Sequence, residues 1–130
     1  METNEKNEAV AGEVDIFDEV IRSIVGAAAV GVEGVVAMRG GIIEGLKEAA
    51  TGKRDYSKGV EVKRAEENAC ILDLFVIVEY NINIVEVAKR VQFVAKERVE
   101  SLTGKKVKAV NVHVVDLKFQ EAHTTEAEKS

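Results

Sequence analysis

Apart from its carboxylates, this 130-residue sequence has few side chains that could act as nucleophiles, bases or metal ligands. It contains one cysteine, Cys70, and two histidines, His113 and His123. A zinc site of the usual type needs four cysteine or histidine ligands, and a disulfide needs two cysteines. We expect Cys70 to be a small buried side chain, and His113 to be a neutral histidine on the outward face of a strand with no nucleophile beside it. The residues therefore predict no catalytic centre, no metal site and no cofactor.

Glycine-rich phosphate loops are not predicted either. A phosphate loop of this type has a first glycine, four further residues and then Gly-Lys. For the pairs Gly52-Lys53 and Gly104-Lys105 the first glycine would fall at positions 47 and 99, where the chain has Lys47 and Val99. Gly31-Val32-Glu33-Gly34 has the spacing of loops that clamp nucleic acids, but it lacks flanking basic residues. We interpret it as the end of a helix.

The net charge of −5 is concentrated at the two ends of the chain. Residues 1–12 and 120–130 each carry a net charge of −2 and lack apolar periodicity, so we expect both to be disordered acidic tails. The residues between them, 13–119, carry a net charge of about −1 and are predicted to form a single domain. No stretch is apolar enough over the length of a membrane span, so we expect no direct membrane insertion.

One segment, Lys53–Arg64, is basic, with a net charge of +3. Together with Lys105, Lys106 and Lys108 it leaves a second hypothesis open, a small nucleic-acid-binding domain. The sequence has only four phenylalanines and two tyrosines, which offer few stacking platforms near these lysines. We therefore expect a modest electrostatic surface without specific binding to nucleic acid.

Hydrophobic periodicity predicts two amphipathic helices. The first begins at Phe17 and ends near Gly31–Gly34, and the second lies between an N-cap at Asn83 and a terminating glycine, Gly104. The apolar stripe of the first is expected to hold Phe17, Val20, Ile21, Ile24, Val25 and Ala28. The buried stripe of the second is expected to hold Ile84, Val87, Ala88, Val91, Val94, Ala95, Val99 and Leu102.

Alternating apolar residues predict four strands, at Val35–Met38, Gly59–Glu66, Ala69–Tyr80 and Lys106–Phe119. Glu67-Asn68 is predicted to be a two-residue hairpin turn, and the alternation of the last strand changes phase, which predicts a bulge near Val114. The glycine-rich region 39–58 is expected to be a mobile loop with a marginal helix.

A strand, a helix and a strand at the end of the chain imply a right-handed crossover, which makes the last strand parallel to the one before the helix. The sequence therefore predicts an α+β two-layer sandwich, with a small mixed β-sheet and both main helices on one face.

Two surfaces are expected to make contacts with other proteins. The first is predicted to mediate self-association through apolar residues on the outward face of the long strand and at the end of the chain's last strand: Ile71, Phe75, Ile77, Leu117 and Phe119. The second is predicted to be a partner surface on the second helix, formed by Lys89, Gln92, Phe93 and Lys96. Phe93 falls on the polar side of that helix, where partial burial under a loop is the alternative to a partner contact.

Several segments, in one colinear order from Gly12 to Phe119, resemble the alkaline shock protein family of Gram-positive bacteria, also called the general stress protein family. They are Val32–Met38, Ser57–Val62, Asp73–Tyr80, Val85–Val99, Thr103-Gly104 and Val110–Val114. The positions that carry the resemblance are Gly34, Val35, Gly59, Val60, Gln92, Gly104 and Asn111. Ala37–Gly40 and the closing Val115–Phe119 make the chain look most similar to the branch often encoded near fatty-acid synthesis genes.

The resemblance implies a protein without an assigned active site. Members of the family are abundant cytoplasmic proteins that self-associate, and some are held at the membrane by a separate transmembrane partner. They are tied to cell-envelope stress, and the fatty-acid-linked branch suggests acetyl-CoA carboxylase as a regulated partner. For this chain the resemblance implies a cytoplasmic homo-oligomer that acts through protein contacts, with a membrane-anchoring protein or acetyl-CoA carboxylase as candidate partners.

Overall fold

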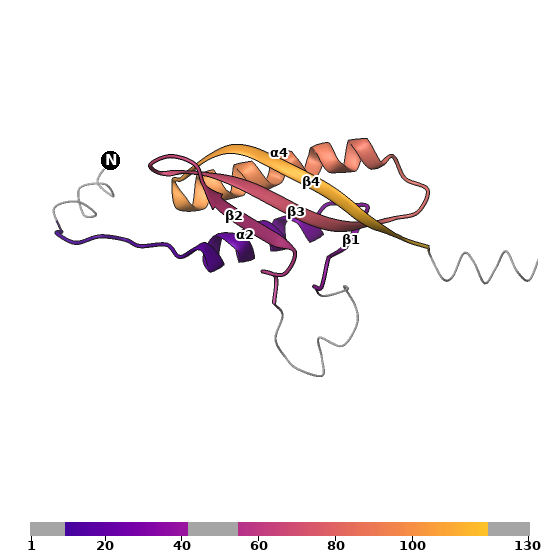
Figure 1. Cartoon of the computed structure of the whole chain (residues 1–130), viewed down its shortest axis with the longest axis horizontal. Helices are drawn as coiled ribbons and strands as arrows, with labels where there is room; N and C mark the ends of the chain where they lie inside the picture. Colours follow the sequence, from indigo (N-terminus) through magenta and orange to yellow (C-terminus); the bar gives the residue numbers. More distant parts are fainter. Residues whose placement is uncertain (1–9, 42–54, 120–130) are drawn as a thin grey trace, which may run out of the picture.

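The computed structural model describes residues 10–41 and 55–119 (Figure 1). Residues 42–54 make up most of the predicted mobile loop 39–58 and include Lys53 and Arg54 of the basic segment. They lie outside the described residues. The elements follow in the order α2 (Asp18–Val30), β1 (Val35–Met38), β2 (Val60–Arg64), β3 (Ala69–Glu79), α4 (Ile84–Thr103) and β4 (Lys106–Lys118).

The sheet is built around β3, which pairs with all three other strands. β2 pairs antiparallel with the first half of β3 and β1 with its second half, so these two short strands follow one another along the same edge. β4 runs parallel to β3 along its other edge. The sheet is therefore mixed, as predicted from the strand–helix–strand order.

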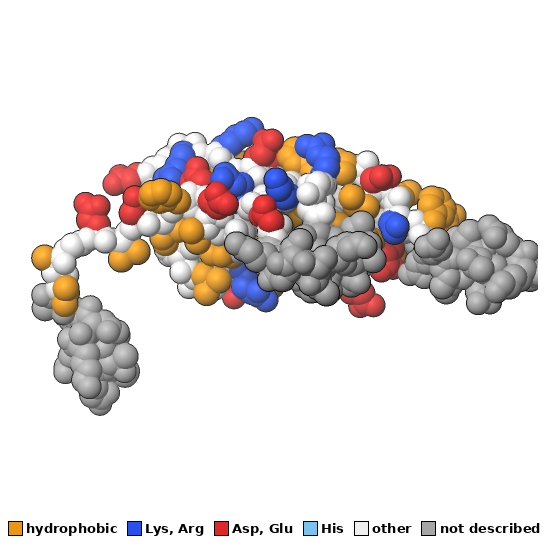
Figure 2. All heavy atoms as spheres, turned by 90° about the horizontal axis from the view of Figure 1, so that it is seen from below, with side chains coloured by type: hydrophobic (Ala, Val, Ile, Leu, Met, Phe, Trp, Pro, Cys, Tyr) orange, Lys and Arg blue, Asp and Glu red, His pale blue; other side chains and the backbone are white. Residues whose placement is uncertain are grey.

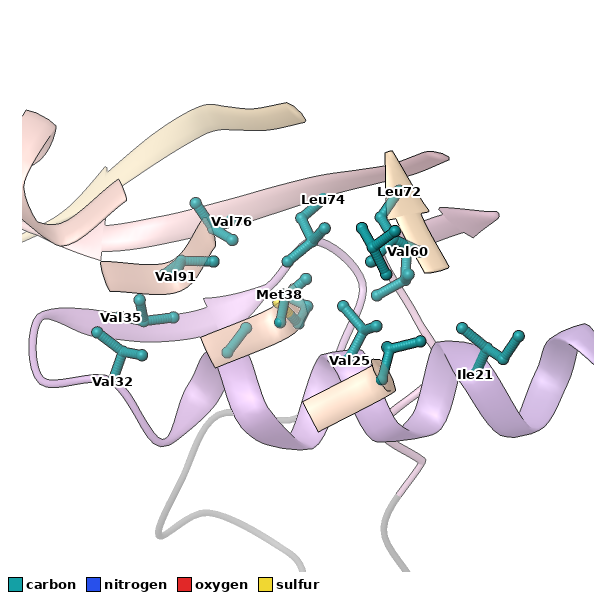
Figure 3. Packing of buried hydrophobic residues seen from close by; sticks show 14 of the residues in the cluster. Ile21, Val25, Val32, Val35, Met38, Val60, Leu72, Leu74, Val76 and Val91 are labelled. Carbon is teal, nitrogen blue, oxygen red and sulfur yellow. The ribbon is translucent and has the colours of Figure 1, made fainter. Parts of the chain in front are cut away.

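Both helices cover one face of this sheet (Figure 1). α2 contacts β1 and β2, α4 contacts β4, and the two helices contact each other. Figure 3 shows Leu72, Leu74 and Val76 of β3 with Val25 of α2 and Val91 of α4 in the layer between them. The predicted α+β two-layer sandwich is confirmed.

Local chemistry explains where α4 begins and ends. The Asn83 side chain accepts a hydrogen bond of 3.0 Å from the Glu86 N–H, which satisfies one of the free donors of the first turn. Gly104 ends the helix in the left-handed region, with φ 79°. Both predicted signals are confirmed, and α2 ends at Val30 as its glycines indicate.

Four residues that the periodicity placed in buried stripes are exposed. Ile84 and Leu102 point to the buried side of α4 but lie in its first and last turns, where little of the fold covers them. Phe17 precedes the first turn of α2 as its N-cap, and Val20 lies about 100° around the helix from the buried Ile21. The predictions for these four side chains are wrong.

The connections of β3 differ in detail from the sequence expectation. The turn between β2 and β3 has four residues, 65–68, and is closed by a hydrogen bond from the Ala65 N–H to the Ala69 carbonyl and by a positive φ of 61° at Asn68. In β4 the register with β3 passes from Val114 directly to Asp116, so Val115 is an extra residue, and the predicted bulge is confirmed.

Candidate functional site

The outer face of the sheet, defined here as the face opposite α2 and α4, carries the first candidate surface. Side chains alternate along β3, and those at even positions are buried against the helices. Ile71, Phe75 and Ile77 therefore lie on the outer face, as predicted, and each is half-buried. Among the residues that the structure describes, no helix covers this face.

Phe75 is held between two side chains from different parts of the chain. The guanidinium carbon of Arg39, which follows β1, lies 4.2 Å from the centroid of the Phe75 ring. The ring of His113, on β4, stacks on Phe75 with a centroid distance of 4.6 Å and an interplanar angle of 16°. Cation–π attraction and stacking therefore fix the aromatic ring at the centre of the outer face.

Asp73 lies beside this stack and is 8% exposed, a low value for a carboxylate. Its Oδ1 contacts His113 Nε2 at 3.0 Å and accepts a hydrogen bond of 3.2 Å from Asn111 Nδ2. Its Oδ2 lies 3.8 Å from Lys63 Nζ, and no described residue donates a hydrogen bond to it.

The hydrogen bond with His113 is the main reason that the pKa of Asp73 lies below its ordinary value. The hydrogen bond from Asn111 and the charge of Lys63 act in the same direction, and partial burial opposes them. Asp73 is therefore an ionised, paired group that organises the outer face. Sequence analysis gave no role to Arg39 or Asp73, because the register that aligns Asp73 with Asn111 and Phe75 with His113 joins distant segments.

Leu117 and Phe119 do not share a face with the other predicted self-association residues. After the bulge at Val115, Leu117 pairs with the core residue Val78, which places it on the helix side of the sheet. Phe119 stacks on Tyr80 with a centroid distance of 4.3 Å at the end of the sheet. These two residues therefore lie away from the surface formed by Ile71, Phe75 and Ile77, and their role in self-association stays a prediction.

The second candidate surface is a hollow of about 380 Å³ between α4 and β4, which we call the α4–β4 groove. Its lining includes all four residues of the predicted partner surface and the first part of β4: Lys89, Gln92, Phe93, Lys96, Val107, Lys108, Ala109 and Val110. Phe93 is 70% exposed, so its predicted position on the surface is confirmed. A second hollow lies against Phe93 on the side of Gly31–Glu33.

Two residues of the groove also tie α4 to β4. Gln92 Nε2 donates a hydrogen bond of 2.9 Å to the Val110 carbonyl, and Lys96 Nζ donates to Glu100 Oε2 at 3.0 Å and to the Val107 carbonyl at 3.4 Å. Glu100 accepts from the Val107 N–H at 2.9 Å, and this bond is the main cause of the lowered pKa of Glu100. These bonds satisfy backbone groups of β4, which pairs with β3 alone among the described strands.

The residues that carry the family resemblance mostly build the fold. Gly59 has φ 79°, and a Cβ there would lie 2.9 Å from the Cβ of Met38. Gly34 has φ 103°, and its added Cβ would lie 2.8 Å from a methyl group of Val87. Val35 and Val60 are buried, Gly104 ends α4, Gln92 bonds β4, and Asn111 bonds Asp73.

Two of the three basic residues in the described part of the basic segment form ion pairs, and the third, Lys58, makes none with a described residue. Lys63 pairs with Asp73, and Arg64 pairs with Asp18 at 2.9 Å. Lys108, from the second group of lysines, pairs with Glu66 at 2.9 Å. These pairings give the nucleic-acid hypothesis no support.

The described residues contain no cluster of three or more histidine, cysteine or acidic side chains that could hold a metal ion. Within the same ranges, no helix has the length and apolar character required to cross a bilayer. The described residues thus form an α+β domain with two candidate surfaces, the outer face of the sheet and the α4–β4 groove.

The chain belongs to the alkaline shock protein 23 family, which is described as having a cell envelope-related function and whose model matches residues 6–119. The predicted resemblance to the alkaline shock proteins is confirmed at this level. No catalytic family is indicated.

The chain is also similar to proteins of Bacillus subtilis and Streptococcus pyogenes. The chain is 35% identical to the uncharacterized protein YqhY of B. subtilis over 108 residues, which cover 83% of the chain and 78% of YqhY. It is 39% identical to the uncharacterized protein YloU of B. subtilis over 105 residues, which cover 79% of the chain and 86% of YloU. It is 31% identical over 121 residues to a stress response regulator gls24 homolog of S. pyogenes serotype M3, 93% of the chain and 66% of that protein.

A solved structure of a variant MamM C-terminal domain has a partial likeness in fold. Its TM-score is 0.48 at 11% sequence identity, and the match covers 78% of this chain and 96% of that domain.

Proposed function

We propose that this protein is a non-enzymatic, self-associating cytoplasmic module of the envelope stress response, which acts through protein contacts. The observation that carries the proposal is the outer face of the sheet, where Ile71, Phe75 and Ile77 are left without a covering helix among the described residues. The family's cell envelope-related function sets the physiological context.

The structure of the outer face supports a second copy as the covering partner. A patch of apolar side chains on an otherwise charged surface favours protein contact, and soluble homo-oligomers most often use a self-complementary patch. The outer face carries both signs of charge around its apolar centre, with Arg39, Glu61 and Lys63 on one side of β3 and Asp116 and Lys118 on the other. Two such faces related by a twofold axis can pair opposite charges.

The partner surface on α4 extends this proposal to a second protein. Phe93 stands exposed between two hollows, with Lys89 beside it, and an aromatic residue in such a setting is a frequent anchor of protein interfaces. The candidate partners remain those that the resemblance implies, a membrane-anchoring protein or acetyl-CoA carboxylase. The second of these applies if the chain lies in the branch encoded near fatty-acid synthesis genes.

Sedimentation velocity of the full chain tests the proposed self-association. The wild-type protein is expected to sediment above monomer mass at micromolar concentration, and Phe75→Glu is expected to shift it to smaller species, because the new carboxylate would be buried at the contact. Val20→Glu is the matched control, since it adds the same charge at an exposed position of α2 in the opposite layer. A wild-type protein that stays monomeric at high micromolar concentration, or an oligomer unaffected by Phe75→Glu, would contradict the proposal.

A further inference from the structure

An exposed arm precedes α2 and is unused by the fold. Residues 10–15 are exposed, and only Ile16 packs against the core. Among the described residues, none makes a hydrogen bond to the backbone of 10–16. Figure 1 shows this arm, Val10–Phe17, running away from the sheet and helices, and Figure 2 shows hydrophobic and acidic side chains along it.

The arm combines exposed apolar side chains with carboxylates. Val10 and Val14 are 83% and 89% exposed, and Gly12 between them has φ 128°. Glu13 and Asp15 flank Val14, and neither pairs with a described residue. Phe17, 67% exposed, ends the arm. Large apolar side chains exposed this far are typical of a segment that docks on another surface.

The α4–β4 groove has the complementary pattern. Its apolar lining comes from Phe93, Val107, Ala109 and Val110, and every charged residue in its lining is a lysine. Lys96 and Lys108 each have an acidic partner within the fold, whereas Lys89 makes no ion pair with any described residue. An apolar hollow with a cationic rim fits an apolar segment with carboxylates along one side.

We infer that the arm of one copy docks in the α4–β4 groove of a second copy. Val14 would rest on the apolar lining around Phe93, and the flanking Glu13 and Asp15 would approach the lysines at the rim, Lys89 and Lys108, of which Lys108 also pairs with Glu66. The charge complementarity favours this occupant, because the arm combines two highly exposed valines with two carboxylates that make no ion pair with a described residue. The inference rests on the proposed self-association and adds a second contact to it.

This contact is heterologous. The arm leads into α2, which packs under β1 and β2, whereas the groove lies along β4 at the opposite edge of the sheet. A copy that receives an arm in its groove therefore still offers its own arm to another copy. Contacts of this type extend with concentration and do not stop at a dimer unless the rotation closes a ring.

Charge reversal tests the contact in the full-length protein. One variant carries Glu13→Lys with Asp15→Lys, and the other carries Lys89→Glu with Lys108→Glu. Each is expected to weaken association about 10-fold in sedimentation velocity at low salt, because two opposite-charge pairs become like-charge pairs. A chain with all four substitutions is expected to recover most of the association. Lys58→Glu with Arg98→Glu, which reverses two charges away from the groove, is the control.

Mixing the two reversed variants gives a sharper result. The intact arm of the groove variant fits the intact groove of the arm variant, and the reversed arm fits the reversed groove, so the mixture is expected to regain an association between unlike copies that neither variant shows alone. A labelled peptide of residues 10–17 should bind the wild-type chain and Phe75→Glu equally, and bind the groove variant about 10-fold more weakly.

The outcomes separate this inference from the proposed function. The docking of the arm would be overturned if the charge reversals left association unchanged, or if the chain with all four substitutions did not recover association. It would also be overturned if the 10–17 peptide bound the wild-type chain and the groove variant equally. If Phe75→Glu still dissociates the protein in that case, self-association through the outer face stands. If the peptide binds as expected but Phe75→Glu leaves association unchanged, the outer-face interface fails and the arm contact stands.

Discussion

Replacing Phe93 with alanine should cost the protein little stability, although a phenylalanine is among the largest apolar residues. Its side chain is 70% exposed, so only about a third of its surface is withdrawn from water. A fully buried phenylalanine loses roughly 3–5 kcal/mol on truncation, which scales here to about 1–1.5 kcal/mol. Alanine also favours a helix interior by about 0.5 kcal/mol relative to phenylalanine. The expected net loss for Phe93→Ala is therefore about 0.5–1 kcal/mol.

Urea unfolding followed by circular dichroism measures this difference. Ile21→Ala, at a helical position that is 1% exposed, is the matched control and should cost about 2–5 kcal/mol. The two variants should have clearly different urea concentrations at the midpoint of unfolding, and a similar dependence of the free energy of unfolding on urea concentration. A loss of about 3 kcal/mol or more for Phe93→Ala would refute the reasoning, because it would place Phe93 in the packed core. A small loss together with weakened binding of the 10–17 peptide would assign the residue to contact with other chains.

Two further predictions concern the outer face and the loop that leads into it. Because the pKa of Asp73 is lowered in the folded protein, its ionised form should stabilise the fold above the ordinary aspartate pKa of about 4, and this contribution should be lost as the pH falls through the lowered value. The unfolding midpoint of Asp73→Asn should therefore be lower than that of the wild type at pH 7, and the difference between the two midpoints should shrink below about pH 4. A difference that stays constant from pH 7 to pH 3 would contradict the stabilising role of ionised Asp73. Gly59→Ala should destabilise the protein by on the order of 1–3 kcal/mol, since it combines a positive φ with close contacts to Met38 and Arg39, whereas Gly31→Ala, at φ −80°, should have little effect. Thermal unfolding of both glycine variants compares them directly.

Structural features that depend on neighbouring residues in the chain could be predicted from the sequence. The Asn83 cap, the Gly104 stop and the alternation of β3 depend on local backbone chemistry, and each is present in the structure. The phase change in β4 also predicted the bulge, because an extra residue must shift the alternation. The chain order of strand, helix and strand then fixed the parallel pairing of β3 and β4.

Features that depend on long-range register were not readable in the same way. The side of the sheet that Leu117 occupies depends on where the bulge falls, since a shift of one residue moves a side chain to the other face. The Asp73 cluster joins β2, β3 and β4, and Arg39 reaches Phe75 from the end of β1. No single strand contains the whole cluster, so the cluster becomes visible only when the strands are aligned.

The central claim is that the outer face of the sheet is buried between copies of this chain. Photo-crosslinking tests it most directly, with Phe75 replaced by p-benzoylphenylalanine and, in a control protein, Val20 of α2 replaced in the same way. Val20 is exposed on the helix layer, so it reports contacts away from the outer face. The account predicts an efficient covalent dimer from position 75, with its cross-link mapped by mass spectrometry to β3 or β4 of the other copy. Associated protein that gives no cross-link from position 75 would contradict it.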